Sequence, residues 1–563
     1  MDEALLVGVV AVVAIVTVNA LASRVKVAPP LLLVLVGVAV SLIPGFPAVE
    51  IEPEVILLGI IPPLLYSAAV AVPATEFRRD FWAISSLSVV LVILSSLLMG
   101  LFFVQVIPGI GFAIGAALGA VVSPTDAVAV QVIKKMGVSP RVVTVLEGES
   151  MLNDATALVL TRTAVAASVA SMSLFEAAWD LSRAVGIAVV IGLIAGEANV
   201  RLRRAVPGAA SSTAISFVAP FAAAVPAELL DASGLVAAVV AGLVAGFRAP
   251  IFLRPADRIS ERANWHTAEL LLEGAVFLIL GLELITLLED VEETHGSIAA
   301  AVGLGAAALV LVLLVRTAYI APLVMIAARR ARRARRRLAE RAGGAGQAGG
   351  TGGADGASRA GLRREQRHAD AAYQENRPLG WREGSVLVWA GLRGAITLAA
   401  AQTLPSDTPM RSTLVLIAFV VAAGSLLIQG FTLPHLTRRL GIAGETPHDE
   451  WEKAELRGLV AGVADAMLAD PALRRADGSP YEPRVVEAVH RAVVHARDEE
   501  DDEVDMGAQF LELRLAVVEA QRARLLEARK VGTYGGHALA EVMRILDAEQ
   551  ISAHLRAEDP DAD

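Results

Sequence analysis

The chain has 563 residues, of which 55% are hydrophobic and 19% charged, and its mean hydropathy is +0.58. A chain this long and this apolar is not an ordinary soluble protein, so the composition indicates a polytopic membrane protein. The lack of cysteine excludes disulfides, thiolate metal sites and cysteine nucleophiles. The net charge of -10 says little about function, because the charges are segregated along the chain.

Apolar windows recur through the first three quarters of the chain. A spanning helix needs about 20 mostly apolar residues. Windows of about that length or somewhat shorter begin near Ala4, Pro29, Val55, Phe81, Gly111, Val142, Ala184, Val206, Asp231, Leu270, Ile298, Ser385 and Ser412. The sequence therefore predicts an all-α membrane protein of about thirteen transmembrane helices. Met1-Asp2-Glu3 lacks the basic start of a secretory signal, so we expect the first window to be a helix of the protein.

The basic residues gather in every second loop, as the positive-inside rule predicts. Basic clusters include Arg24, Arg78, Lys134, Arg201, Arg254 and Arg329, whereas the intervening loops carry acidic residues such as Glu52, Glu228 and Glu289. An odd number of helices then places the N-terminus outside and the C-terminus in the cytoplasm. We expect the protein in the cell (inner) membrane.

Two polar segments follow the predicted helices. Residues 329–380 pass from an arginine run to a tract rich in Gly and Ala, which predicts a flexible cytoplasmic linker within a transmembrane domain of residues 1–436. The arginines set the topology and attract anionic lipid. Residues 437–563 have helical apolar spacing and predict a small helical cytoplasmic tail, in which the acidic run 498–503 is a solvated surface.

Residues 121–160 interrupt apolar sequence with acidic and polar side chains. An ionised carboxylate at the bilayer centre costs about 3 kcal/mol, so such residues indicate an ion or proton path. Pro124, within Ser123-Pro124-Thr125-Asp126, is expected to break its helix. Irregular backbone in a membrane persists only where it is buried or lines a polar cavity, and Thr125 and Asp126 lie at this break.

The next window carries Glu147 to Asp154. On a helix, Glu147, Ser150 and Asp154 fall on one face, while Glu149 and Asn153 fall on another. The first face is able to hold a cation through Asp154 with Ser150 one turn away, because hard cations prefer oxygen ligands.

A second interruption, Gly391-Leu392-Arg393-Gly394, lies about seven windows after the first. Paired broken helices in corresponding positions of two halves indicate an inverted repeat with a site near the midplane. Arg393 cannot lose its charge, so it requires a buried anion, and Glu149 is the candidate.

These segments resemble the sodium/proton exchanger family, specifically its bacterial cation:proton antiporter branch. The resemblance covers about residues 1–436 and rests on the segments 123–126, 147–154, 277–281 and 391–394. It implies a homodimer, with inverted repeats and two crossed, broken helices in each protomer. It also implies exchange of sodium, or alternatively lithium or potassium, for protons, in the service of pH homeostasis.

The resemblance also implies residue roles. Asp154 binds either the cation or the proton, and Ser150 and Thr125 help to coordinate the ion. Glu149 and Arg393 form a structural ion pair. Asn153, at a position where electrogenic relatives carry aspartate, implies electroneutral one-for-one exchange. Asp126 is expected to compensate the helix dipoles at the break.

One position departs from the family pattern. Some relatives carry a glutamate directly after the aromatic residue of the Pro-Pro-Leu-Leu motif, whereas here Ser67 follows Tyr66. A second carboxylate from that helix is therefore missing. For this reason the cation preference of those relatives does not transfer to this chain.

Several alternatives stay open at this stage. Ser150 could bond only its own helix backbone, and Glu147 could face either a water funnel or a neighbouring helix. Glu273, Glu283 and Arg316 could pair with one another. A potassium/proton antiporter, a cation channel, an intramembrane hydrolase and an enzyme in the tail are the other functional classes. We expect no enzymatic chemistry, no cofactor and no nucleic acid partner; the partners are monovalent cations, protons and lipids.

Overall fold

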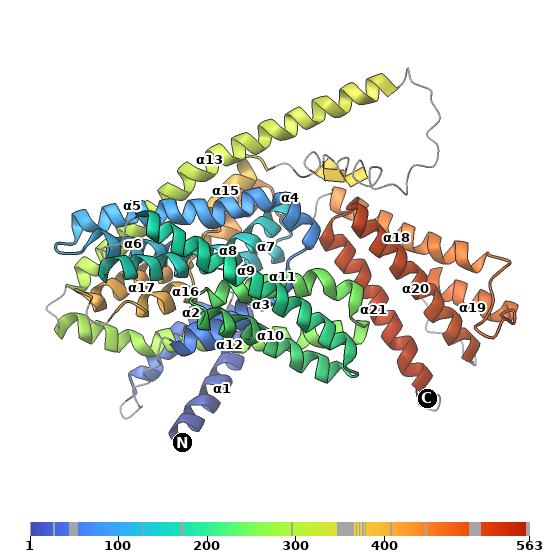
Figure 1. The fold of residues 1–563 in the computed structure, drawn as a ribbon, viewed down its shortest axis with the longest axis horizontal. Coiled ribbons are helices and arrows are strands. Elements are labelled where there is room, and N and C mark those ends of the chain that lie inside the picture. Colours follow the sequence, from blue (N-terminus) through green and yellow to red (C-terminus); the bar gives the residue numbers. More distant parts are fainter. Residues whose placement is uncertain are drawn as a thin grey trace. The chain divides into compact units, whose positions relative to one another are not determined.

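The computed structural model describes residues 2–25, 29–43, 54–126, 128–169, 174–293, 297–345, 365–366, 369–370, 372–373, 377, 379–405, 408–444, 447–494 and 508–558. Over these residues every regular element is a helix (Figure 1). The chain divides into two compact units. The transmembrane unit comprises residues 1–252, 260–329 and 379–444, and the tail unit comprises residues 253–259, 330–378 and 445–563.

The predicted apolar windows all fall on helices. In chain order these are α1 (Asp2–Val25), α2 (Pro29–Ser41), η1 (Val55–Ile60), α3 (Ile61–Ala71), α4 (Ala74–Ser85), η2 (Ser86–Val90), α5 (Leu91–Val106), α6 (Phe112–Val122), α7 (Val128–Lys135), α8 (Pro140–Val169), α9 (Leu174–Ala205), α10 (Ala209–Leu229), α11 (Gly234–Phe252), α12 (Pro255–Glu293), α13 (Ile298–Ala345), α15 (Trp381–Trp389), α16 (Ala395–Gln402) and α17 (Arg411–Leu440). Seven helical stretches of the described residues are long and apolar enough to cross a membrane, and four shorter apolar helices accompany them. The protein is therefore a multi-pass membrane protein.

Small residues bring three of these helices close together. Gly192 and Gly196 of α9 lie against the backbone of α11, and Gly242 and Gly246 of α11 lie against the backbone of α3. A Cβ atom at any of the four positions would collide with a carbonyl oxygen of the neighbouring helix. Small residues four apart are the usual means of close helix packing in a bilayer, where helices gain little from the hydrophobic effect.

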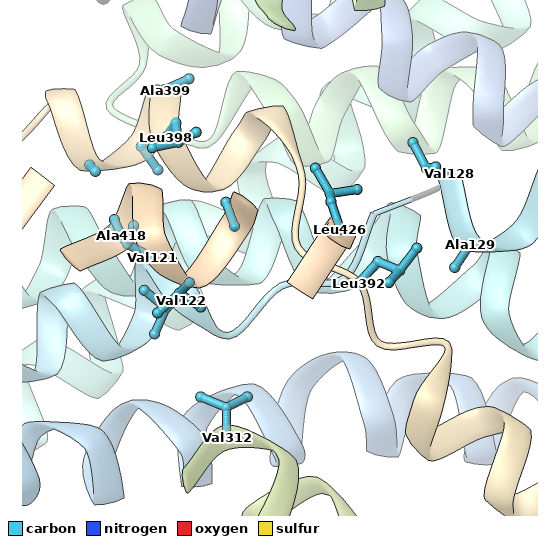
Figure 2. Close-up of a cluster of buried hydrophobic side chains, with 14 of the residues drawn as sticks. Val121, Val122, Val128, Ala129, Val312, Leu392, Leu398, Ala399, Ala418 and Leu426 are labelled. Carbon is cyan, nitrogen blue, oxygen red and sulfur yellow. The ribbon is translucent and has the colours of Figure 1, made fainter. Parts of the chain in front are cut away.

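The two predicted helix breaks are present and meet. The first separates α6 from α7 at Ser123–Asp126, and the second separates α15 from α16 at Ala390–Gly394. The backbone N–H of Asp126 donates to the carbonyl oxygen of Leu392 at 2.7 Å. Apolar side chains from both broken helices and from α13 and α17 surround the crossing, and Figure 2 shows them. The prediction of two crossed, broken helices is confirmed.

One element is longer than the sequence predicts. Helix α13 continues through the arginine run to Ala345, so the first part of residues 329–380 is helical rather than an irregular linker. The physical reason is that Ala, Arg, Leu and Glu are strong helix formers. Residues 346–364, which include most of the Gly-rich tract, lie outside the described residues.

The tail unit contains α18 (Pro447–Leu468), α19 (Pro483–Val494), α20 (Ala508–Val531) and α21 (Gly536–Glu558). Its helices pack through apolar residues that include Leu456, Val518 and Leu539, in keeping with the helical spacing of the sequence. The unit also includes the first turn of α12, where Arg258 donates to the carboxylate of Asp547. The acidic run 498–503 lies outside the described residues.

Candidate functional site

Helix α8 carries five of the polar residues singled out by the sequence. Proline is favoured in the first turn of a helix because it lacks only an N–H that would have no partner there, and α8 begins at Pro140. Gly148 lets the side chain of Ile84 approach α8 closely. The helix is thereby held against α4, and four of the five residues are buried inside the transmembrane unit, namely Glu149, Ser150, Asn153 and Asp154.

Asp154 is a buried carboxylate, with 6% of its surface exposed. Across the part of the chain that the structure describes, its carboxylate forms no hydrogen bond and no ion pair. Asp126, at the first helix break, lies close enough for the two negative charges to interact. Asp154 thus lies beside the crossing of the broken helices as a site able to take a positive charge.

Asn153 links α8 to the first break. Its side-chain N–H donates to Oγ1 of Thr125 at 2.9 Å, and both residues are at most 2% exposed. The Oδ1 atom of Asn153 is buried and has no hydrogen-bond partner among the described residues. Because a buried acceptor without a partner costs about 1–3 kcal/mol, this oxygen fits the chemistry of a cation ligand.

Ser150 donates its hydroxyl to the carbonyl oxygen of Glu147 at 3.2 Å, within its own helix. The sequence left open that Ser150 bonds its own helix backbone, and the structure shows this bond. The hydroxyl oxygen keeps lone pairs, so the bond does not prevent it from also accepting or coordinating.

Glu149 forms a buried charge pair with Arg316 on α13. The two nitrogens at the end of Arg316 each bond one carboxylate oxygen, the Nη2–Oε2 distance being 2.9 Å. The Nε of Arg316 also donates to the carbonyl oxygen of Leu387 at 3.0 Å. The expected direct pair of Glu149 with Arg393 is therefore wrong, because a second arginine that the sequence could not place lies nearer.

Arg393 instead fastens the two breaks to each other. Its Nε donates to the carbonyl oxygen of Val122, the last residue of α6, at 3.2 Å. Its guanidinium also bonds the carbonyl of Gly391, and its backbone N–H donates to Ser425 of α17 at 2.9 Å. The last carbonyl groups of a helix have no donor within the helix, and Arg393 donates a hydrogen bond to one such carbonyl at the end of α6.

Glu147 has a cationic partner on the neighbouring helix. Lys134 of α7 forms an ion pair with its carboxylate, and the Lys134 side chain is 46% exposed. Of the two surroundings that the sequence left open for Glu147, the structure shows a neighbouring helix.

A carboxylate does reach Ser67, although not from its own helix. The Ser67 hydroxyl donates to Glu269 of α12, and Glu273 one turn later lies close enough for its charge to interact with Asp126. Glu283, farther along α12, accepts from Gln402 of α16. Arg316 holds Glu149 instead, so among the described residues it is not the partner that was suggested for Glu273 and Glu283. The sequence analysis missed Glu269. Its spacing of four residues from Glu273 in an apolar window places both carboxylates on one side of α12 and could have indicated it.

The family of the chain can now be stated. A family model described as "Sodium/hydrogen exchanger, transmembrane" matches residues 9–439, which is more than half of the sequence and contains both breaks and all of α8. The chain belongs to the sodium/hydrogen exchanger family.

Relatives extend the similarity along the whole chain. An uncharacterized Na⁺/H⁺ exchanger of Mycobacterium tuberculosis is 28% identical over 571 residues, covering 98% of this chain and 97% of the relative. A Na⁺/H⁺ antiporter of Bacillus atrophaeus is 26% identical over 458 residues, covering 78% of this chain and 76% of the relative. The similarity to the first relative thus includes the tail unit.

A solved structure shares the fold. The sodium proton antiporter of Methanocaldococcus jannaschii matches with a TM-score of 0.57 at 17% identity, covering 78% of this chain and 99% of that chain. At this identity the match supports the architecture and no residue role.

Proposed function

We propose that this protein exchanges sodium for protons across the membrane at Asp154. The supporting observation is a difference among the three carboxylates of α8. Glu147 is paired with Lys134 and Glu149 with Arg316, whereas Asp154 has no cationic partner among the described residues. Family membership and the names of the relatives, several of which are Na⁺/H⁺ antiporters, agree with this activity.

Competition for one carboxylate couples the two fluxes. Asp154, exposed alternately to the two sides, leaves each side with either a cation or a proton, so neither ion crosses without the return of the other. Sodium is the transported substrate, and its ligands are Asp154, Oγ1 of Thr125, Oδ1 of Asn153 and the Ser150 hydroxyl. These are the oxygen ligands that hard cations prefer.

The exchange is electroneutral in this proposal. Asn153 is uncharged, so Asp154 is the carrier of a single positive charge in each direction, and the site moves one sodium ion for one proton. Asp126 and the pair Glu149–Arg316 support the site without carrying the ion: Asp126 lies at the break, and Arg316 neutralises Glu149.

The proposal includes the setting of the transporter. Residues 1–436 form the transport domain of a homodimer in the cell membrane, and residues 437–563 form a cytoplasmic tail, with the N-terminus outside. No chemical step and no cofactor is required, so the protein is not an enzyme. In this orientation, the cytoplasmic ends of the helices are those that carry the exposed residues Arg78, Lys134 and Arg329.

Proteoliposomes test the proposal directly. When sodium is added outside, the purified chain should make the lumen more alkaline, because sodium enters as protons leave. The Asp154→Asn variant should show no such change, while Glu147→Gln serves as a matched acidic control on the same helix. Parallel series with lithium and potassium give the cation preference. Uptake of sodium against its gradient, driven by an imposed pH gradient, distinguishes antiport from a channel, which would show no such uptake.

A further inference from the structure

A long apolar groove lies between α4–α5 and α13, away from the exchange site. It has a volume of about 490 Å³, within the range of about 300–1,000 Å³ found for small-molecule sites. One wall includes Trp82, Leu94 and Leu98, and the other includes Leu314, Ala318 and Ile326. All these residues belong to the transmembrane unit, and Trp82 and Leu314 are 54% and 60% exposed.

One end of the groove is basic. Helices α4–α5 and α13 run antiparallel, because Ser86 contacts Tyr319 while Leu91, farther along α5, lies with Val312, earlier in α13. The beginning of α4 and the later part of α13 therefore lie at the same end of the groove.

Two exposed arginines continue those walls. Arg78 precedes Trp82 by one helical turn, and Arg329 follows Ile326 by three residues, so each lies on the helix side that lines the groove. Arg329 is also the first residue of the arginine run 329–337. The groove thus opens at one end toward positive charge.

Hydroxyl groups lie part-way along the groove, one helical turn past Trp82. The hydroxyl of Tyr319 contacts that of Ser86, and it also donates to the carbonyl oxygen of Ser86 at 3.3 Å. From its basic end, the groove therefore presents guanidinium groups, then the apolar side chains of Trp82 and Ile326, then the two hydroxyl groups, then further apolar side chains. A phospholipid carries its phosphate at one end and hydrocarbon beyond it, which matches a groove with one basic end and an apolar length.

We propose that this groove binds one anionic phospholipid. The phosphate lies at Arg78 and Arg329, and one acyl chain extends past Trp82 and Ala318 toward Leu314. The positive charge is what selects an anionic lipid over a zwitterionic one, because basic pockets between transmembrane helices at a basic membrane face bind anionic head groups. The site is separate from Asp154, and the proposal does not depend on the transport activity.

Trp82 provides a direct reporter, because it lines the groove. The full-length protein in detergent micelles is titrated with dibrominated phosphatidylglycerol or dibrominated phosphatidylcholine, and the Trp82→Phe variant gives the fluorescence of the other five tryptophans for subtraction. The Trp82 emission should be quenched by the anionic lipid at a mole fraction about tenfold lower than by the zwitterionic lipid, since two arginines contribute.

Two sets of variants test the two ends of the lipid. Arg78→Gln with Arg329→Gln should remove the preference for phosphatidylglycerol while quenching by both lipids persists. Ala318→Phe fills the groove and should reduce quenching by both, whereas Ala307→Phe, at an exposed position of α13 outside the groove, should leave it unchanged. Equal quenching of the unaltered protein by the two lipids would show ordinary annular contact and overturn the proposal. Absence of quenching by either lipid would overturn it as well, and would point to a second copy of the chain covering the groove.

Discussion

Glu149 and Asp154 lie five residues apart on α8, and both are almost fully buried, at 1% and 6% exposed. Glu149 is held by a guanidinium through two hydrogen bonds, whereas Asp154 has no such partner within the described residues. A buried charge requires compensation, which Arg316 of α13 gives to Glu149 and which, in the proposed function, the transported ion gives to Asp154. Burial of a carboxylate therefore does not by itself indicate transport; the surrounding charges do.

The strongest test of this comparison removes the charge of Asp154. The Asp154→Asn variant should lower sodium-driven proton movement to the level of empty vesicles, because an amide takes up neither ion. Size-exclusion chromatography and the thermal unfolding temperature should match those of the unaltered protein, since no ion pair is lost. Retained exchange by Asp154→Asn would show that another group carries the ions.

Removing the charge of Glu149 should affect stability instead. Glu149→Gln leaves Arg316 buried without its anion, which typically costs about 3–5 kcal/mol. A large fall in the thermal unfolding temperature of the detergent-solubilised protein is expected. The double variant Glu149→Gln with Arg316→Met should be more stable than the single variant, because no charge is then left unpaired. A single variant as stable as the original would contradict the structural role of the pair.

A third variant gives the proposed ion site a second carboxylate. Asn153→Asp places a carboxylate next to Thr125, so the site then holds one more negative charge than a single sodium ion neutralises. Exchange by this variant should respond to an imposed membrane voltage, whereas exchange by the original chain should not. The measurement is proton flux in proteoliposomes at several diffusion potentials, and voltage-dependent exchange by the original chain would refute the electroneutral proposal.

A smaller effect is expected at the contact between Ser67 and Glu269. Ser67→Ala removes one hydrogen bond, with a net contribution of about 1 kcal/mol, so the KM for sodium should change by about fivefold if this contact shapes the site. Glu283→Gln, which weakens the separate contact with Gln402, is the control. An identical change in KM for both variants would contradict a specific effect of the contact between Ser67 and Glu269 on the site.

The smallest effect is expected at Glu147. Its partner Lys134 is 46% exposed, and partly exposed pairs contribute about 0–1 kcal/mol. Glu147→Gln should therefore keep both the unfolding temperature and the exchange rate close to those of the unaltered chain. A loss of exchange as complete as that of Asp154→Asn would mean that the two carboxylates share the transport role.

Local features of this fold could be predicted from the sequence, and pairings between distant residues could not. Pro124 and Gly391–Gly394 indicated the two breaks because they disturb the helix in which they lie. Helical angles likewise separated Asp154 from Glu149. The partner of Glu149 was not predictable, because Arg316 is 167 residues away and the sequence offers another buried arginine. The hydrogen bond between Ser67 and Glu269 was missed for the same reason, because these residues are 202 positions apart in the sequence.

The meeting of the two breaks limits how the protein can move. The N–H of Asp126 bonds the carbonyl of Leu392, and a methyl group at Gly394 would overlap the carboxylate of Asp126. Sliding one broken helix past the other would break this hydrogen bond and leave both backbone groups without their partners. The pair is therefore expected to turn as one rigid body during the transport cycle. The bending that accompanies each turnover then falls on the connections around α6, α7, α15 and α16.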